Sequence, residues 1–150
     1  MNLGARLAIA FLWLVHWLPA GWQSAIGALV GAFAYRLAAG RRRVARRNLG
    51  LCLPELDSRA RERLVQDHFR WLGRSLVERG LLWYAPRERL MRLIEVQGDV
   101  EFAERSDAPV MWLVPHFMAL EAAATAVQLF QSRRGATIYQ AQSNPVFDAA

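Results

Sequence analysis

The feature that most constrains the fold is a run of 29 residues, Leu7–Tyr35, that contains no Asp, Glu, Lys or Arg. Its length alone is enough to span a bilayer. Pro19 interrupts it, however, and leaves an apolar first half of twelve residues, roughly 18 Å of helix against a hydrocarbon core of about 30 Å. The pattern predicts a hydrophobic membrane anchor over residues 1–40, either as one kinked span or as two helices that dip into one leaflet.

The positive charge lies directly after this run. The net charge is +6 and all cationic side chains are Arg: residues 1–54 hold seven Arg and no acid, and residues 55–150 hold twelve Arg against thirteen acids. Basic residues beside an apolar segment are typical of a cytoplasmic membrane flank. A nucleic-acid binder would spread its charge over a folded face. We therefore expect a basic flank with amphipathic helices over residues 41–93, and no nucleic-acid partner.

Local signals predict several helices beyond the flank. Asp57 or Ser58 can cap a long helix, because short polar side chains accept hydrogen bonds from the first free N–H groups. Tyr84 and Pro86 should close that helix. A short helix over residues 87–93 and a brief one over residues 99–105 are expected to follow.

A proline-bounded apolar run predicts the centre of the last region. Val110–Val114 has no polar alternation, which is typical of a short strand buried on both faces. His116 follows directly after Pro115, at the mouth of a helix predicted over Met118–Phe130. Glu121 stands in the first turns of that helix. Its carboxylate and the imidazole converge only if His116 precedes the helix, since five helical residues rotate a side chain by roughly 140°.

Two further apolar segments, residues 94–96 and 137–141, read as strands separated by helices. This order predicts an α/β fold, with a parallel-type sheet flanked by helices that begins in residues 94–150. Reactive groups of such sheets lie at the carboxyl ends of strands. His116 follows one predicted strand and Asn144 follows the next, so Asn144 is a candidate substrate-binding residue.

The pairing of an imidazole with a carboxylate suggests general base catalysis. The imidazole of His116 can take a proton from a hydroxyl, and the carboxylate of Glu121 can orient the ring and stabilise the imidazolium. The segment offers no Ser or Cys nucleophile, so the hydroxyl would belong to the substrate. The alternative is structural: a histidine at a strand end that only packs, and a glutamate favoured by the helix dipole.

Three segments resemble a known family in the correct order. His116-Phe-Met-Ala-Leu-Glu121 resembles the His-x-x-x-x-Asp/Glu motif of the glycerolipid and lysophospholipid acyltransferase superfamily, and is most similar to the lauroyl and myristoyl transferases of lipid A biosynthesis. Residues 43–56, Arg-Val-Ala-Arg-Arg-Asn-Leu-Gly-Leu-Cys-Leu-Pro-Glu-Leu, resemble the Arg-Asn-Leu and Phe-Pro-Glu-Leu signature of this branch. Leu53 stands where Phe is common. Asn144-Pro145 resembles a turn that the family carries further on.

The resemblance implies an enzyme of lipopolysaccharide biosynthesis at the cytoplasmic face of the bacterial inner membrane. It would move a fatty acyl chain from an acyl carrier protein thioester to a hydroxyl of a lipid A precursor, with His116 as base and Glu121 as orienter. No cofactor is needed in that scheme. One cysteine and no Cys/His cluster of zinc spacing predict no metal site. Family members are longer, so we expect this chain to form the N-terminal half of the full fold.

Two alternatives stay open at this point. A membrane-anchored α/β module without catalysis, a scaffold or a decayed relative, could bind an anionic partner through its Arg cluster. A cleaved signal peptide could also explain the apolar start, although Leu18 lies where a small residue is preferred and the arginines that follow would resist translocation.

Overall fold

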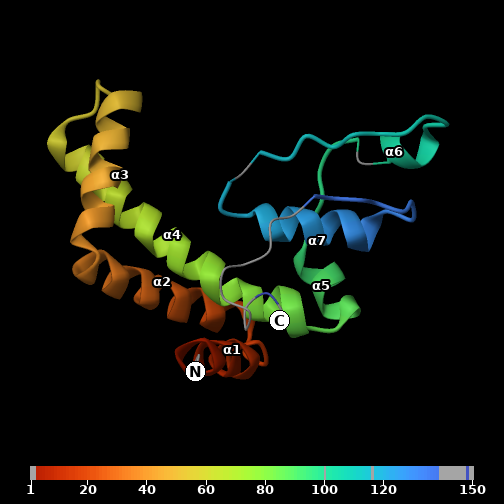
Figure 1. Ribbon diagram of the computed structural model, residues 1–150, viewed down its shortest axis with the longest axis horizontal. Helices are drawn as coiled ribbons and strands as arrows, with labels where there is room; N and C mark the ends of the chain where they lie inside the picture. Colours follow the sequence, from red (N-terminus) through yellow and green to blue (C-terminus); the bar gives the residue numbers. More distant parts are fainter. Residues whose placement is uncertain (1–2, 100, 116, 139–147, 149–150) are drawn as a thin grey trace. The chain divides into compact units, whose positions relative to one another are not determined.

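The computed structural model describes residues 3–99, 101–115, 117–138 and 148 of the chain (Figure 1). These residues belong to two compact units. One unit comprises residues 18–78, and the other joins residues 1–17 to residues 79–150. A long helix, α4 (Ser58–Tyr84), contributes its first part to one unit and its last turns to the other.

The uncharged N-terminal run forms two separate helices, α1 (Leu3–Val15) and α2 (Ala20–Leu37). Pro19 is the residue before α2, with φ −54° and ψ 146°, so the predicted break is confirmed. Helices of 13 and 18 residues are roughly 20 and 27 Å long. Within the described residues, none of the helices combines the length and apolarity needed to cross a bilayer. The predicted hydrophobic membrane anchor is therefore wrong: the break at Pro19 makes both helices short, and α2 carries polar residues.

Glycines bring α2 and α4 into backbone contact within the first unit. A Cβ atom built on Gly31 would lie 2.0 Å from the carbonyl oxygen of Phe69, and one on Gly73 would lie 2.1 Å from that of Gly27. Real Cβ atoms do not approach backbone oxygens so closely, so only glycine permits this crossing. Gly27 and Gly31, four residues apart on α2, thus contact another helix of the same chain.

A third helix, α3 (Ala39–Cys52), is joined to α4 by polar contacts in the same unit. Arg46 donates to both carboxylate oxygens of Glu62, at 2.6 and 2.8 Å, and the Tyr35 hydroxyl donates to Glu62 as well. These hydrogen bonds, Arg46 first, lower the pKa of Glu62 to about 2. Asp57 Oδ1 accepts from the Ala60 N–H at 2.6 Å, which confirms the predicted cap of α4.

The second unit packs α1 and the end of α4 with three shorter helices, α5 (Arg87–Leu93), α6 (Phe102–Arg105) and α7 (Leu120–Phe130). Leu81, Leu90 and Leu129 form its buried cluster, one from each of α4, α5 and α7. Gly80 lies against the backbone of α1, where an added Cβ would be 2.4 Å from the Leu12 carbonyl oxygen.

The predicted parallel sheet is wrong for the part of the chain that the structure describes, in which no residue has strand pairing. The run chosen as the central strand, residues 110–114, is neither helical nor paired as a strand, and Met111 and Leu113 are each 95% exposed. Side chains bind the backbone that precedes this run. Arg133 donates to the carbonyls of Ala103 and Ser106 at 2.6 and 2.8 Å. The apolar run predicted burial, but pairing needs a distant partner that a local pattern does not supply.

Candidate functional site

Of the predicted site residues, the structure describes Glu121, at the start of α7. His116 and Asn144 lie outside the described residues, so their predicted roles stay predictions. The helix itself begins at Leu120, with Ala119 before it, which places position 116 ahead of the first helical turn in the sequence. This is the order that the predicted pairing with Glu121 requires.

Glu121 stands in the first turn of α7 and is half-buried. Its Oε1 forms an ion pair with Arg79 Nη2 at 2.7 Å. Its Oε2 is shielded from solvent and has no hydrogen-bond donor among the described residues. A carboxylate held at one oxygen, with the other oxygen unused, can accept an N–H from a further side chain.

Arg79 is the residue of this site that sequence reasoning missed. It lies on α4, whereas Glu121 is on α7, and both belong to the second unit. No spacing rule joins two residues so far apart in the chain, and Arg79 is one of nineteen arginines. The sequence therefore gave no signal for this pair, because the packing of α4 against α7 creates it.

Backbone hydrogen bonds shape the approach to α7. The Phe117 N–H donates to the Pro115 carbonyl at 2.8 Å, and the Leu120 N–H donates to the Phe117 carbonyl at 3.1 Å. The chain therefore turns tightly between the extended segment and the helix. No side chain caps α7 at Ala119. The free N–H groups of its first turn and the helix dipole favour a carboxylate here.

An apolar groove of about 390 Å³ runs along α7. Its floor is made of small helical side chains, including Ala119, Ala123 and Ala126, and Ile94 and Trp112 contribute walls. Successive helical residues are 100° apart, so Glu121 lies roughly 160° around the helix from Ala123. The groove and the carboxylate thus occupy opposite faces of α7, and the groove does not place an acyl chain at Glu121.

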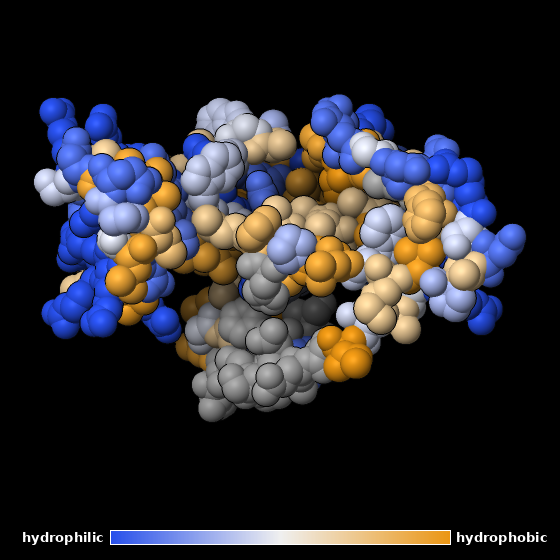
Figure 2. Space-filling model, turned by 90° about the horizontal axis from the view of Figure 1, so that it is seen from above, coloured by the Kyte–Doolittle hydropathy of each residue, from blue (hydrophilic) through white to orange (hydrophobic). Residues whose placement is uncertain are grey.

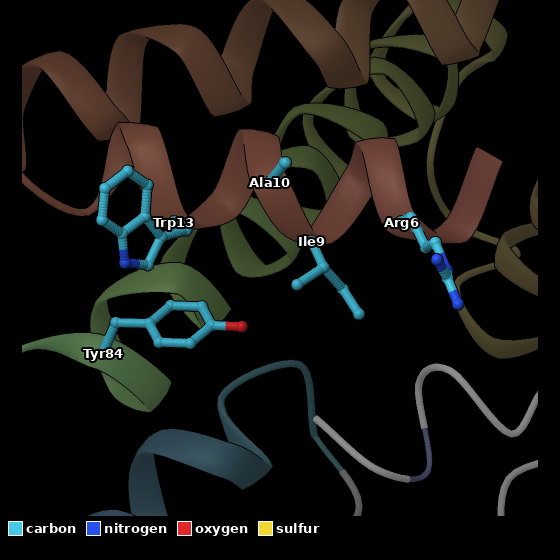
Figure 3. A pocket seen from close by; sticks show the side chains of 5 residues that line it. All are labelled: Arg6, Ile9, Ala10, Trp13 and Tyr84. Atoms are coloured by element: carbon cyan, nitrogen blue, oxygen red, sulfur yellow. The ribbon is translucent and has the colours of Figure 1, made fainter. Parts of the chain in front are cut away.

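A second open pocket, also of about 390 Å³, lies between α1 and the end of α4 (Figure 3). Arg6, Ile9 and Trp13 extend from one side of α1, and the Tyr84 ring faces them from α4. Ile9 and the aromatic rings make it mostly apolar, and it contains no carboxylate or imidazole. It offers binding surface but no catalytic group.

Of the two other histidines, His16 has a packing role. It is 3% exposed, its Nδ1 hydrogen-bonds the Trp13 carbonyl, and its ring centroid is 4.6 Å from that of Trp17 and 5.7 Å from that of Tyr84. Its own carbonyl accepts from Arg89 Nη1 at 2.6 Å. His16 thereby connects α1 to α4 and α5 within the second unit.

Comparison with protein families decides the identity of the chain. The family model described as "Bacterial lipid A biosynthesis acyltransferase" matches residues 2–150. The chain belongs to this family. The resemblance inferred from the His116–Glu121 motif and from residues 43–56 is confirmed at this level.

Three relatives in Escherichia coli (strain K12) illustrate the similarity of this lipid A acyltransferase family member to curated proteins. A lipid A biosynthesis lauroyltransferase is 33% identical over 147 residues, 95% of this chain and 46% of the relative. A palmitoleoyltransferase is 34% identical over 125 residues, 82% of this chain and 41% of the relative. A myristoyltransferase is 31% identical over 147 residues, 97% of this chain and 45% of the relative.

The chain therefore spans less than half the length of these lipid A acyltransferases. No solved structure matches it significantly.

Proposed function

We propose that the protein transfers a fatty acyl chain from the thioester of acyl carrier protein to a hydroxyl of a lipid A precursor. The match of the lipid A acyltransferase family to residues 2–150 is the observation that carries this proposal. The position of Glu121 supports it, since Arg79 holds one carboxylate oxygen and no described residue donates to the other.

In the proposed reaction His116 acts as the general base. Its imidazole removes the proton of the acceptor hydroxyl while the hydroxyl oxygen attacks the thioester carbonyl. A new oxygen–carbon bond forms and the carbon–sulfur bond breaks. The thiolate of the carrier leaves and takes the proton back from the imidazolium. Nothing is oxidised or reduced, so the scheme requires no redox cofactor, and it assigns no step to a metal.

Glu121 would orient the imidazole and stabilise its protonated form, and Arg79 would act as a positioning residue through Glu121. An orienting carboxylate must point one oxygen at the ring N–H during the whole reaction. The 2.7 Å ion pair between Arg79 Nη2 and Oε1 restricts the rotation of this carboxylate and leaves Oε2 as the oxygen for the ring. Asn144 would bind substrate at the edge of the same site.

We place this reaction at the cytoplasmic face of the bacterial inner membrane, where the lipid acceptor would be presented. Large apolar side chains exposed on α1, on α2 and between them support contact with a lipid surface, among them Leu7, Trp17, Trp22 and Phe33. Tryptophan favours the headgroup level of a bilayer. This is a proposal of surface contact by exposed side chains and not of the anchor predicted from the sequence.

Acyl transfer measured by mass spectrometry tests the proposal, with acyl carrier protein as donor and lipid A precursor as acceptor. Replacing His116→Ala should lower kcat by at least about a hundred-fold, because general base catalysis typically contributes that much or more. Glu121→Gln preserves shape but removes the charge, and a loss of about a thousand-fold is expected. Transfer by the His116→Ala variant at the wild-type rate would refute the enzyme proposal.

Unimpaired transfer by Glu121→Gln would instead show that Glu121 does not orient the imidazole, while His116 could still act as the base. If the wild-type protein transfers nothing yet binds anionic lipid through its arginines, the non-catalytic module is correct. A histidine outside the site supplies the control: His68 is exposed on α4, and His68→Ala should transfer at the wild-type rate.

A further inference from the structure

Four of the arginines of α3 form two pairs in the structure. Arg42 donates to the carbonyls of Tyr35 and Arg36, the latter at 2.7 Å, and its guanidinium is 5.0 Å from the Tyr35 ring centroid. Arg46 is bound by the carboxylate of Glu62. These two side chains join α2, α3 and α4, so their guanidinium groups already have partners within the unit.

Arg43 and Arg47 form the other group. Both are exposed, and in the described part of the chain neither makes a hydrogen bond or an ion pair. They are four residues apart on α3 and therefore share a face, about 40° from one another. The centre of that face is about 100° around the helix from the centre of the pair Arg42 and Arg46.

Two apolar side chains occupy the same outer face. Val44 is 54% exposed and Leu51 is 72% exposed. With Arg43 and Arg47 they fall within an arc of about 100° on the helix. Figure 2 shows hydrophobic residues among hydrophilic ones at the left of the view, the side on which α3 and the start of α4 are drawn in Figure 1. We call these four residues the α3 outer face.

Cations mixed with apolar side chains on one helical face match a lipid surface of negative charge. In the bilayer interface, guanidinium groups bind headgroup phosphates and the apolar groups enter the boundary below them. An acidic protein would satisfy Arg43 and Arg47 equally well. A lipid surface accounts for both kinds of side chain at once, because its phosphates bind the guanidinium groups and its acyl boundary takes up the exposed Val44 and Leu51.

We propose that the α3 outer face binds anionic lipid headgroups, with the guanidinium groups of Arg43 and Arg47 on phosphates and with Val44 and Leu51 in the acyl boundary. This deepens the proposed function, since it names the surface that would hold the protein at the membrane. It does not depend on acyl transfer, and direct lipid binding tests it.

Binding of the full protein to vesicles, measured by co-sedimentation, provides the experiment. The vesicles contain equal parts of phosphatidylcholine and phosphatidylglycerol, with phosphatidylcholine alone as the neutral reference. The double variant Arg43→Gln/Arg47→Gln should bind the anionic vesicles about thirty-fold more weakly than wild type, since each basic residue near the surface contributes about five-fold. Val44→Ser/Leu51→Ser should also weaken binding, by about ten-fold.

The matched control is Arg59→Gln/Arg63→Gln. These arginines are also exposed and four residues apart, on α4 of the same unit, so the change in net charge is identical. Wild-type binding by this control supports a specific α3 face. Equal losses in both double variants would mean that net charge alone matters, and the proposal is then wrong.

A second readout separates lipid from protein as the partner. If Arg43→Gln/Arg47→Gln binds vesicles like wild type but loses affinity for acyl carrier protein in solution, the surface serves a protein and the proposal fails. Acyl transfer to a detergent-dispersed acceptor is measured in parallel. Retained transfer with lost vesicle binding supports the proposal, whereas an inactive wild type would refute the proposed function without affecting the vesicle result.

Discussion

The helices of residues 18–78 and the non-helical segments that follow α5 satisfy their backbone hydrogen bonds in different ways. In the first region, α2 and α4 contact each other through Gly31 and Gly73, with backbone against backbone. In the second, an apolar run such as residues 110–114 is extended, and Leu113 is 95% exposed. Both regions are rich in apolar residues, so composition does not explain the difference.

What separates them is the source of their backbone hydrogen bonds. A helix pairs its own N–H and C=O groups within each turn and then packs as a finished unit. An extended segment must find another strand before its backbone is paired. In the described part of the second unit, side chains such as Glu104 and Arg133 bind the exposed backbone in place of a strand: the Ser132 N–H donates to Glu104 Oε1 at 2.7 Å. Such bonds hold a loop but build no sheet.

Identical Leu→Ala substitutions in the two kinds of segment test this contrast most strongly. Leu90 of α5 is 5% exposed and belongs to the buried cluster with Leu81 and Leu129. Leu90→Ala should therefore lower the free energy of unfolding by about 3 kcal/mol. Leu113→Ala should change it by less than about 0.5 kcal/mol, because its side chain is exposed. Urea denaturation followed by circular dichroism measures both. Equal losses would show that residues 110–114 are buried, as the sequence pattern predicted.

Glycine substitutions within α2 probe the close crossing. An alanine normally stabilises a helix by up to about 1 kcal/mol relative to glycine. Gly31→Ala should instead cost about 2 kcal/mol, since the new methyl group would collide with the Phe69 carbonyl. Gly21 has no atom within 4 Å of a built Cβ, so Gly21→Ala is the control and should be neutral or stabilising. A stabilising Gly31→Ala in thermal unfolding would disprove the backbone contact.

Arg79 links the helical frame to the candidate site. Arg79→Gln should lower kcat for acyl transfer by about ten-fold with KM unchanged, because a positioning residue acts on the transition state through Glu121. Arg79→Lys keeps a cation within reach and should restore part of the rate. Arg63→Gln, an exposed arginine of the same helix, serves as the comparison. A change in KM alone, without effect on kcat, would argue for substrate binding instead.

The smallest effect concerns the pH dependence of the α3–α4 contact. The pKa of Glu62 is lowered from 4.5 to about 2 by Arg46 and Tyr35. A lowered folded-state pKa stabilises the fold above pH 4.5, and this contribution disappears as the pH falls toward 2. Glu62 is near the surface, so screening limits the gain to about 1 kcal/mol. Glu62→Gln should lose this amount at pH 7 and nothing near pH 2, as urea titrations at both pH values will measure.

The sequence predicted the helices whose ends depend on local chemistry. Asp57 caps α4 as expected, Pro19 separates α1 from α2, and α5 spans the predicted residues 87–93. These features need only neighbouring residues, because capping and proline act within one turn. The helix α3 lies in residues that were predicted only as a basic flank with amphipathic helices, and its own bounds were not predicted. Its contacts with Glu62 and Tyr35 stabilise it as a helix.

Features that depend on distant residues were not predicted. The parallel sheet was wrong because the apolar runs at residues 94–96 and 110–114 do not pair in the described structure. For the candidate site, Glu121 was named from its motif, and the structure places it in the first turn of α7. Its partner Arg79 was not named, as the ion pair arises only when α4 and α7 pack together.

Arg79, which forms the ion pair with Glu121, is followed directly by Gly80, which contacts the backbone of α1. Gly80 leaves no space for a side chain against the Leu12 carbonyl, so any larger residue there must push α1 and the last turns of α4 apart. Arg79, one residue earlier, would move with them. A steric change beside α1, far along the chain from the motif, would then lower the proposed acyl transfer, and a screen for loss of that activity should therefore return substitutions at position 80.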